Sequence, residues 1–432
     1  MKKIILCVGL ALLFSVSACT AQNQNLPQIS EEETSGVLKS LSADDMRGRC
    51  ALNLPDITKA AALIASEFKK AGLQTFNGNA DYLQRFQLKQ SIPKTGKLSI
   101  NGKEVKAEDF ALSSNVAQIT LDRIDKKTTI ARGDDFFKRF TEINTQQQNL
   151  LVLIDPSFRK EFGRLKNYLA QGNNSISDKD YTVLYVLGNE KVNSLSLTYQ
   201  NEVKAVPMFN VLGVLPGKSR PNEYVIFSAH YDHIGILDAV AQDSIANGAD
   251  DDASGVASMI ALAKYFAQEK NNERSLIFVA FTAEEMGGYG SQFFSMQLNP
   301  ADVVAMFNIE MVGKVSKWGK NSAFITGFER SDFGEILQKN LEGTSFRFHP
   351  DPYPEQNLFF RSDNKTLARL GVPAHTISTV QIDKDKSYHS VDDEMETLDL
   401  ANLTEITKAI ALSAKSIISG ADTPNRIEDV GE

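Results

Sequence analysis

Residues 224–232 read Tyr224-Val225-Ile226-Phe227-Ser228-Ala229-His230-Tyr231-Asp232, an apolar run that ends in an imidazole and a carboxylate. A short apolar run of this kind is typical of a strand that is buried on both faces of a parallel sheet. Similar runs occur at 275–281, 303–309 and 374–380, and residues 256–268 have the apolar periodicity of a helix. We therefore expect an α/β fold, with a mostly parallel mixed sheet covered by helices on both faces.

Residues that can carry chemistry follow each of these runs. The second run leads to Glu284 and Glu285, the third ends at Glu310, and His389 follows the last one. A turn that contains Asp250, Asp251 and Asp252 opens the predicted helix. Because the carboxyl ends of parallel strands meet at one edge of a sheet, we expect these side chains to converge there.

A converged cluster of this composition predicts a metal site. Carboxylates that lie close together repel one another unless cations neutralise them. Imidazole nitrogen and carboxylate oxygen without thiolate suit zinc, and the set is too large for one catalytic zinc with three protein ligands. It suits two ions about 3.5–4 Å apart that share a carboxylate. A calcium loop starting at Asp250 is excluded, because Ala261 stands where that loop needs a bidentate Glu.

These segments resemble the zinc aminopeptidases of metallopeptidase family 28. The family carries A-H-x-D, G-A-D-D-x-A-S-G, E-E, N-x-D-x-x-G and Y-H-S/T motifs in this order. The matching segments here are 229–232, 248–255, 284–285, 308–313 and 388–390. The resemblance covers roughly residues 207–415, and residues 41–49 resemble the family's usual start.

The resemblance implies a role for each matching residue. His230 and Glu310 would ligate the first metal, Glu285 and His389 the second, and Asp251 would bridge the two. A cis peptide bond would join Asp251 to Asp252. Glu310 stands where the family usually has Asp, which is one methylene shorter, and the second ion could be zinc or another divalent cation.

Two further residues are assigned catalytic roles by the same resemblance. Glu284 would be the general base, which takes a proton from the attacking water and passes it to the leaving amine. Asp232 would hold the second ring nitrogen of His230. The remaining histidines, His233, His349 and His375, are expected to make only local hydrogen bonds, and Asp250 is expected to serve the turn.

The predicted function is hydrolysis of the N-terminal residues of peptides by a bimetallic aminopeptidase. Two alternatives are a glutaminyl cyclase-like acyltransferase with one zinc and a non-catalytic peptidase-like binding protein. The complete set of ligand positions, and the retention of Glu284 and Glu285, favour hydrolysis. The chain has no G-x-S-x-G motif for a serine hydrolase. Its net charge of −8 argues against binding to nucleic acid.

The N-terminus has the pattern of an export signal. Residues 1–18 contain two lysines, a short apolar run and small residues, which predicts a signal peptide. Val16-Ser17-Ala18-Cys19 resembles a bacterial lipobox, so Cys19 would carry a lipid anchor in the periplasm or cell envelope. The alternative is an ordinary signal that is cleaved near Ala18 or Ala21. The lipid would be the protein's only membrane contact.

The rest of the chain divides by composition. Residues 19–33 are polar and predict a tether, and residues 34–80 and 207–420 are assigned to the catalytic domain. Residues 81–206 alternate β-like runs with polar segments and predict an inserted β-rich accessory lobe, in which Asn101-Gly102 forms a hairpin turn. Residues 421–432 are expected to form a C-terminal tail. The sequence gives no indication of the oligomeric state.

Overall fold

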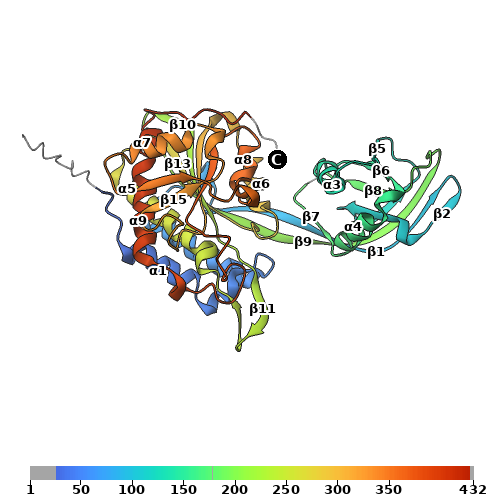
Figure 1. Cartoon of the computed structure of the whole chain (residues 1–432), viewed down its shortest axis with the longest axis horizontal. Coiled ribbons are helices and arrows are strands. Elements are labelled where there is room, and N and C mark those ends of the chain that lie inside the picture. The colour runs from blue at the N-terminus through green and yellow to red at the C-terminus, as the bar shows by residue number, and fades with distance from the viewer. Residues whose placement is uncertain (1–25, 178, 429–432) are drawn as a thin grey trace, which may run out of the picture.

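The computed structural model describes residues 26–177 and 179–428. The predicted signal peptide and Cys19 lie outside the described residues. Figure 1 shows a large α/β domain and a smaller lobe, which are joined by the long strands β1 (Leu83–Ile100) and β9 (Leu195–Leu215). The segment predicted to be an inserted lobe therefore stands away from the large domain, on a ribbon that extends two strands of the main sheet.

The helices are α1 (Glu31–Leu41), α2 (Leu54–Lys70), α3 (Phe136–Asn144), α4 (Arg159–Ala170), α5 (Gly255–Glu269), α6 (Tyr289–Ser295), α7 (Phe333–Asn340), α8 (Asn364–Ala368), α9 (Leu400–Ser413) and α10 (Lys415–Ile418). The other strands are β2 (Lys103–Val105), β3 (Phe110–Ser114), β4 (Gln118–Leu121), β5 (Lys127–Ile130), β6 (Leu150–Ile154), β7 (Asn173–Ser175), β8 (Thr182–Leu187), β10 (Arg220–His230), β11 (Gly235–Val240), β12 (Asp243–Ala246), β13 (Arg274–Phe281), β14 (Val303–Ile309), β15 (Ser322–Ile325), β16 (Arg347–Pro350) and β17 (Ala374–Ser378).

The main sheet is mixed, with a parallel centre. Its strand order is β16-β15-β17-β14-β10-β13-β9-β1-β2. Strand β10 lies between β13 and β14 and is parallel to both, and β14 is parallel to β17. Strand β9 is antiparallel to β13 and to β1. This arrangement confirms the mostly parallel mixed sheet that the apolar runs predict.

Helices cover both faces of this sheet. Along β10, Val225 and Phe227 pack into a core with α1, α2, α5 and α9, whereas Ile226 packs into a second core with α6 and α8. Figure 1 shows these two groups of helices on opposite sides of the sheet. Because successive side chains of a strand point to opposite faces, one continuous apolar run supplies both cores.

The smaller lobe has its own sheet, with strand order β3-β8-β6-β5. One face of it packs on α3 and α4 through residues that include Phe136, Phe162 and Leu165. The other face packs on the outer end of the β1–β9 ribbon, where Leu98 and Leu197 are fully buried. The helices α3 and α4 differ from the sequence prediction, which assigns β-like runs separated by polar segments to this part of the chain.

The two ends of the described chain are more ordered than the sequence pattern indicates. Helix α1 begins at Glu31, inside the expected tether, because Ser30 and Glu33 form a reciprocal capping box there. In the expected tail, Ile427 is buried and its main-chain N–H donates to the carbonyl of Gly371. Across residues 26–177 and 179–428, every helix is too short or too polar to cross a membrane.

Candidate metal centre

The ends of neighbouring parallel strands bring the predicted site residues together. His230 is the last residue of β10 and pairs with Phe281 at the end of β13, three positions before Glu284. On the other side, Ser228 pairs with Asn308 of β14, two positions before Glu310. The convergence predicted from the apolar runs is therefore a direct result of strand register.

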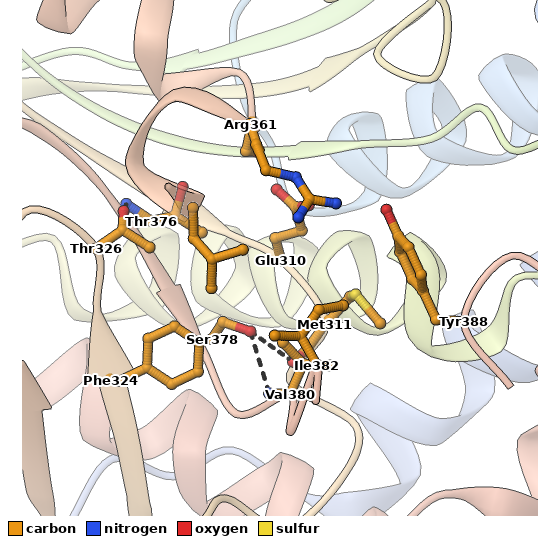
Figure 2. Close-up of a pocket in the computed structure, with 12 residues that line it drawn as sticks. Glu310, Met311, Phe324, Thr326, Arg361, Thr376, Ser378, Val380, Ile382 and Tyr388 are labelled. Carbon is orange, nitrogen blue, oxygen red and sulfur yellow. Dashed lines mark hydrogen bonds between the residues drawn. The ribbon is translucent and has the colours of Figure 1, made fainter. Parts of the chain in front are cut away.

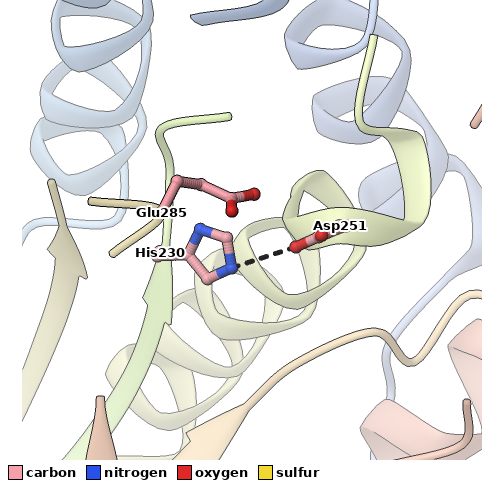
Figure 3. Close-up of side chains that lie close together, drawn as sticks. All are labelled: His230, Asp251 and Glu285. Atoms are coloured by element: carbon pink, nitrogen blue, oxygen red, sulfur yellow. Dashed lines mark ion pairs between the residues drawn. The ribbon is translucent and has the colours of Figure 1, made fainter. Parts of the chain in front are cut away.

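Asp251 lies between two imidazoles. Its Oδ1 is 3.1 Å from Nε2 of His230, and its Oδ2 is 3.3 Å from Nε2 of His389. Nε2 of His389 is also 3.0 Å from Oε2 of Glu285. Figure 3 shows His230, Asp251 and Glu285 directed toward a common space, and one atom from each lies within 4.8 Å of the others. The peptide bond between Asp251 and Asp252 is cis, as the family resemblance predicts.

The electrostatics of this cluster are those of a cation site. Burial raises the pKa of Asp232 and of Glu310 to about 7, and it raises the pKa of Glu284 well above its usual range. Burial acts in the same direction on Asp251, but contacts with His230 and His389 hold its pKa well below the ordinary value. So many carboxyl groups at one buried place need positive charge nearby.

The donor set fits zinc. Within the described part of the chain, Nε2 of His230 is buried and has no hydrogen-bond partner. Unpaired buried polar atoms are costly, so they indicate a group that completes their contacts. Two imidazole nitrogens with carboxylate oxygens are ligands that zinc accepts.

The Asp252 carboxylate fixes the loop that carries Asp251. Its Oδ2 accepts the main-chain N–H of His230 at 3.2 Å, and its Oδ1 accepts those of Gly255 and Met311, each at 3.0 Å. A side chain on Gly255 would collide with this carboxylate and with the carbonyl of Ile309. Asp252 thus ties the end of β10, the start of α5 and the residue after Glu310 together.

Ser254 and Asp250 also bind the segment that follows Glu310. Oγ of Ser254 accepts the N–H of Val312 at 3.0 Å, and Oδ1 of Asp250 accepts the N–H of Gly313 at 2.8 Å. Asp250 therefore serves the turn, as its sequence context indicates. The segment after Glu310 is held along its length by the segment around Asp251.

Arg49 and Asp393 support the loop from outside. The buried guanidinium of Arg49 donates to the carbonyls of Leu41, Tyr231, Asn247 and Gly248 at 2.6–3.0 Å. Asp393 accepts the main-chain N–H groups of Asp250 and Asp251. Neither residue was predicted as part of the site, although Arg49 lies in the segment that resembles the family's start.

Three residues at or next to the site residues have a left-handed backbone conformation. Ala283, Met311 and His389 have φ values of 57°, 52° and 55°. Non-glycine residues rarely adopt this conformation, and they do so mainly where the surrounding structure enforces it. Here the strained residues lie directly beside Glu284, directly after Glu310, and at His389 itself.

Asp232 makes a different contact from the predicted one. Nδ1 of His230 lies 3.1 Å from the main-chain carbonyl of Asp232 and 3.9 Å from its carboxylate. The carboxylate instead accepts the main-chain N–H of Glu284 through Oδ1, at 3.1 Å. The side chain of Asp232 therefore positions the segment of the two glutamates, and its backbone holds the histidine ring.

The histidines outside the predicted ligand set differ in their surroundings. His375 hydrogen-bonds to the carbonyl of Thr326 and to Ser331, and His349 stacks on Trp318. His375 therefore makes local hydrogen bonds, as expected, whereas the contact of His349 is a stacked one with Trp318. His233 does not lie apart from the cluster, because its Nδ1 is 2.8 Å from Oε1 of Glu285.

A small cavity of about 40 Å³ opens beside Glu310. Figure 2 shows Arg361 beside Glu310, with Phe324 and Tyr388 at opposite sides of the cavity. The lining is mostly apolar and also contains hydroxyl groups; its other residues are Met311, Thr326, Leu358, Ser362, Thr376, Ser378, Val380 and Ile382. The cavity can receive a side chain next to the cluster.

Residues 210–414 match the model of the family described as Peptidase family M28. A probable zinc metalloprotease from Pyrenophora teres f. teres (strain 0-1) is 29% identical over 232 residues, which is 52% of this chain and 46% of that protein. A probable zinc metalloprotease from Pyricularia oryzae is 34% identical over 110 residues, which is 25% of this chain and 22% of that protein. The aligned region spans less than half the length of each of these curated relatives.

Solved structures share the fold. A zinc aminopeptidase from Bacillus subtilis superposes with a TM-score of 0.57 and 17% identity, covering 94% of this chain and 100% of that chain. An aminopeptidase from Aneurinibacillus sp. strain AM-1 gives a TM-score of 0.54 and 18% identity, with 94% and 96% covered. At this level of identity, the similarity establishes the architecture.

Proposed function

We propose that the chain is a zinc aminopeptidase of peptidase family M28, whose model matches residues 210–414. The observation that carries the proposal is the convergence of His230, Asp251, Glu285 and His389 within 3.0–3.3 Å contacts. Curated relatives described as probable zinc metalloproteases support the choice of zinc. The substrates are peptides with a free N-terminus.

We assign two ions to the site. His230 and Glu310 would hold the first ion, Glu285 and His389 would hold the second, and Asp251 would be shared between them. The opposed contacts of Asp251, Oδ1 with His230 and Oδ2 with His389, support the bridging role. When bound, zinc supplies a Lewis acid that polarises the scissile carbonyl and activates water.

Glu284 is the proposed general base. Its backbone is fixed by the carboxylate of Asp232, and burial raises the pKa of its side chain well above the usual range. A carboxylate with a raised pKa is a stronger base, so it accepts a proton from the attacking water and returns it to the leaving amine. Such a transfer contributes roughly 10²–10⁴-fold to the rate.

The cavity beside Glu310 supports binding of one substrate side chain next to the cluster. It is small and mostly apolar, which suits the side chain of one substrate residue next to the scissile bond. We therefore propose that the enzyme prefers small or medium apolar N-terminal residues. The exposed Arg361 at this cavity lies where it can contact the substrate from the solvent side.

A substrate panel tests the proposal. The full chain is incubated with aminoacyl-anilides, with the same compounds blocked by an N-acetyl group, and with peptides that begin with Gln. We expect anilide release from the free amines only, loss of release with a chelator, and recovery with zinc. Cyclisation of the Gln peptides without hydrolysis would instead identify a cyclase, and no turnover of any compound would identify a binding protein.

We also propose that the protein is exported and anchored by a lipid on Cys19, which the lipobox-like Val16-Ser17-Ala18-Cys19 supports. Expression in a bacterial host with labelled palmitate tests this. The wild type should incorporate label and sediment with membranes, and Cys19→Ala should do neither. Release of both proteins into the soluble fraction would favour an ordinary signal peptide.

A further inference from the structure

His233 is a buried histidine that the proposed set of ligands does not use. Its side chain is fully buried, and its main-chain N–H donates to the carbonyl of Arg49 at 3.2 Å. Its ring packs on Gly248, where an added Cβ would lie 2.6 Å from the ring. The imidazole is thus held in one place by the loop that carries Asp251 and by the backbone next to Cys50.

This ring contacts one oxygen of the Glu285 carboxylate, and His389 contacts the other. Nδ1 of His233 is hydrogen-bonded to Oε1 of Glu285 at 2.8 Å, while Nε2 of His389 lies 3.0 Å from Oε2. The two oxygens of Glu285 therefore face different imidazoles. His233 is buried, whereas the His389 side chain is 38% exposed, so the fixed contact is the one made by His233.

The geometry of His233 differs from that of a proposed ligand. Nε2 of His230 is only 3.1 Å from Asp251, yet it has no hydrogen-bond partner among the residues that the structure describes. Nε2 of His230 and the carboxylate of Asp251 are therefore close together without being hydrogen-bonded, as expected when both bind one ion. Nδ1 of His233, by contrast, meets hydrogen-bond geometry with Glu285 and is 3.9 Å from the nearer oxygen of Asp251.

The second ring nitrogen of His233 favours the same assignment. Nε2 is buried and unpaired within residues 26–177 and 179–428. If Nδ1 bound a metal, Nε2 would carry the ring hydrogen and become a buried donor without an acceptor. If Nδ1 carries the hydrogen, Nε2 keeps only a lone pair, which is a less severe loss than an orphaned N–H group.

We propose that His233 is a positioning residue that donates from Nδ1 to Oε1 of Glu285 and so directs Oε2 toward the second metal position beside His389. The inference rests on the proposed two-metal function. A hydrogen bond to a ligating carboxylate fixes its orientation, and loss of such a partner lowers metal affinity about 10–100-fold. His233 then controls retention of the second ion without binding it.

Metal affinity in variants tests this role. We compare His233→Ala with His233→Asn, whose amide N–H can replace Nδ1–H, and with His233→Gln, whose amide lies farther out. Zinc affinity is measured by competition with a chelator, and cobalt(II) spectra are recorded at saturating metal. His375→Asn is the matched control, because His375 is also buried and hydrogen-bonded but lies outside the cluster.

We expect His233→Ala to bind the second ion about 10–100-fold more weakly than the wild type. His233→Asn should bind it with near-normal affinity, and the affinity of His375→Asn should be unchanged. Cobalt spectra of the saturated variants should match the wild type. An altered cobalt spectrum with no recovery of affinity in His233→Asn would show that His233 is a ligand. Unchanged zinc affinity in every variant would show that His233 does not position Glu285. If His233→Ala does not fold, the zinc affinities of His233→Asn and His233→Gln are compared instead, and the proposal requires the weaker binding in His233→Gln. A wild type that binds no zinc would instead overturn the proposed function itself.

Discussion

Oδ1 of Asp252 accepts a hydrogen bond from the main-chain N–H of Met311 at 3.0 Å. Each partner lies directly beside a residue proposed to bind metal, Asp251 in one case and Glu310 in the other. Because Met311 has a left-handed backbone, the bond also holds a strained residue in place. The spacing between two proposed ligands on different segments thus depends on a side chain that binds no metal.

Removal of this carboxylate should destabilise the protein even without metal. Asp252→Ala leaves the N–H groups of His230, Gly255 and Met311 without their acceptor. At about 1–3 kcal/mol for each unpaired buried donor, we expect a loss of about 3 kcal/mol or more. Denaturant unfolding in the presence of a chelator measures it, and Asp392→Ala, an exposed change, is the control. An equal midpoint for Asp252→Ala and wild type would contradict the proposed role.

Arg49 should not be replaceable by Lys. The guanidinium reaches four carbonyls around the site, whereas an ammonium on the same backbone has fewer donors and cannot span them. We expect Arg49→Lys to lower the free energy of unfolding by about 2–4 kcal/mol and to weaken zinc binding. Thermal unfolding with and without zinc checks both effects; wild-type values for Arg49→Lys would argue against them.

Glu284→Gln should separate catalysis from metal binding. The amide has nearly the same shape as the carboxylate but cannot accept the proton, so kcat should fall roughly 10²–10⁴-fold. Zinc content should stay near that of the wild type, because Glu284 is not a proposed ligand. Steady-state kinetics and elemental analysis of the same preparation measure the two effects. Loss of metal together with activity would show that the base has been misassigned.

The cavity predicts how specificity can be changed. Ile382 is a half-buried apolar residue of its lining, so Ile382→Ala enlarges the space available to a substrate side chain. Relative kcat/KM for a bulky over a small aminoacyl-anilide should rise by about 10-fold. The same ratio in wild type and variant would place the substrate side chain elsewhere.

The central sheet could be predicted because its strands are local apolar runs. Residues 224–229, 275–281 and 303–309 each lie within the strands β10, β13 and β14. The long pairing of β1 with β9 joins residues that are far apart in the chain, from Leu83 with Val211 to Ile100 with Leu195. No local pattern specifies such a register, which explains why the ribbon that carries the lobe was not foreseen.

The site was predictable for the same reason, but only in part. His230 and Glu285 could be named because each follows a recognisable strand within a short motif. Arg49 and Asp393 act through main-chain groups of other segments, and such contacts leave no spacing in the sequence. The contact of the Asp232 carboxylate with the Glu284 backbone depends on loop geometry in the same way.

The central claim is that this cluster holds two zinc ions bridged by Asp251. Elemental analysis of the purified wild type, after titration with zinc and removal of free metal, tests it most directly when activity is measured on the same samples. We predict two zinc ions per chain at full activity, and clearly less zinc in Asp251→Ala. Full activity with no more than one zinc ion per chain would contradict the account.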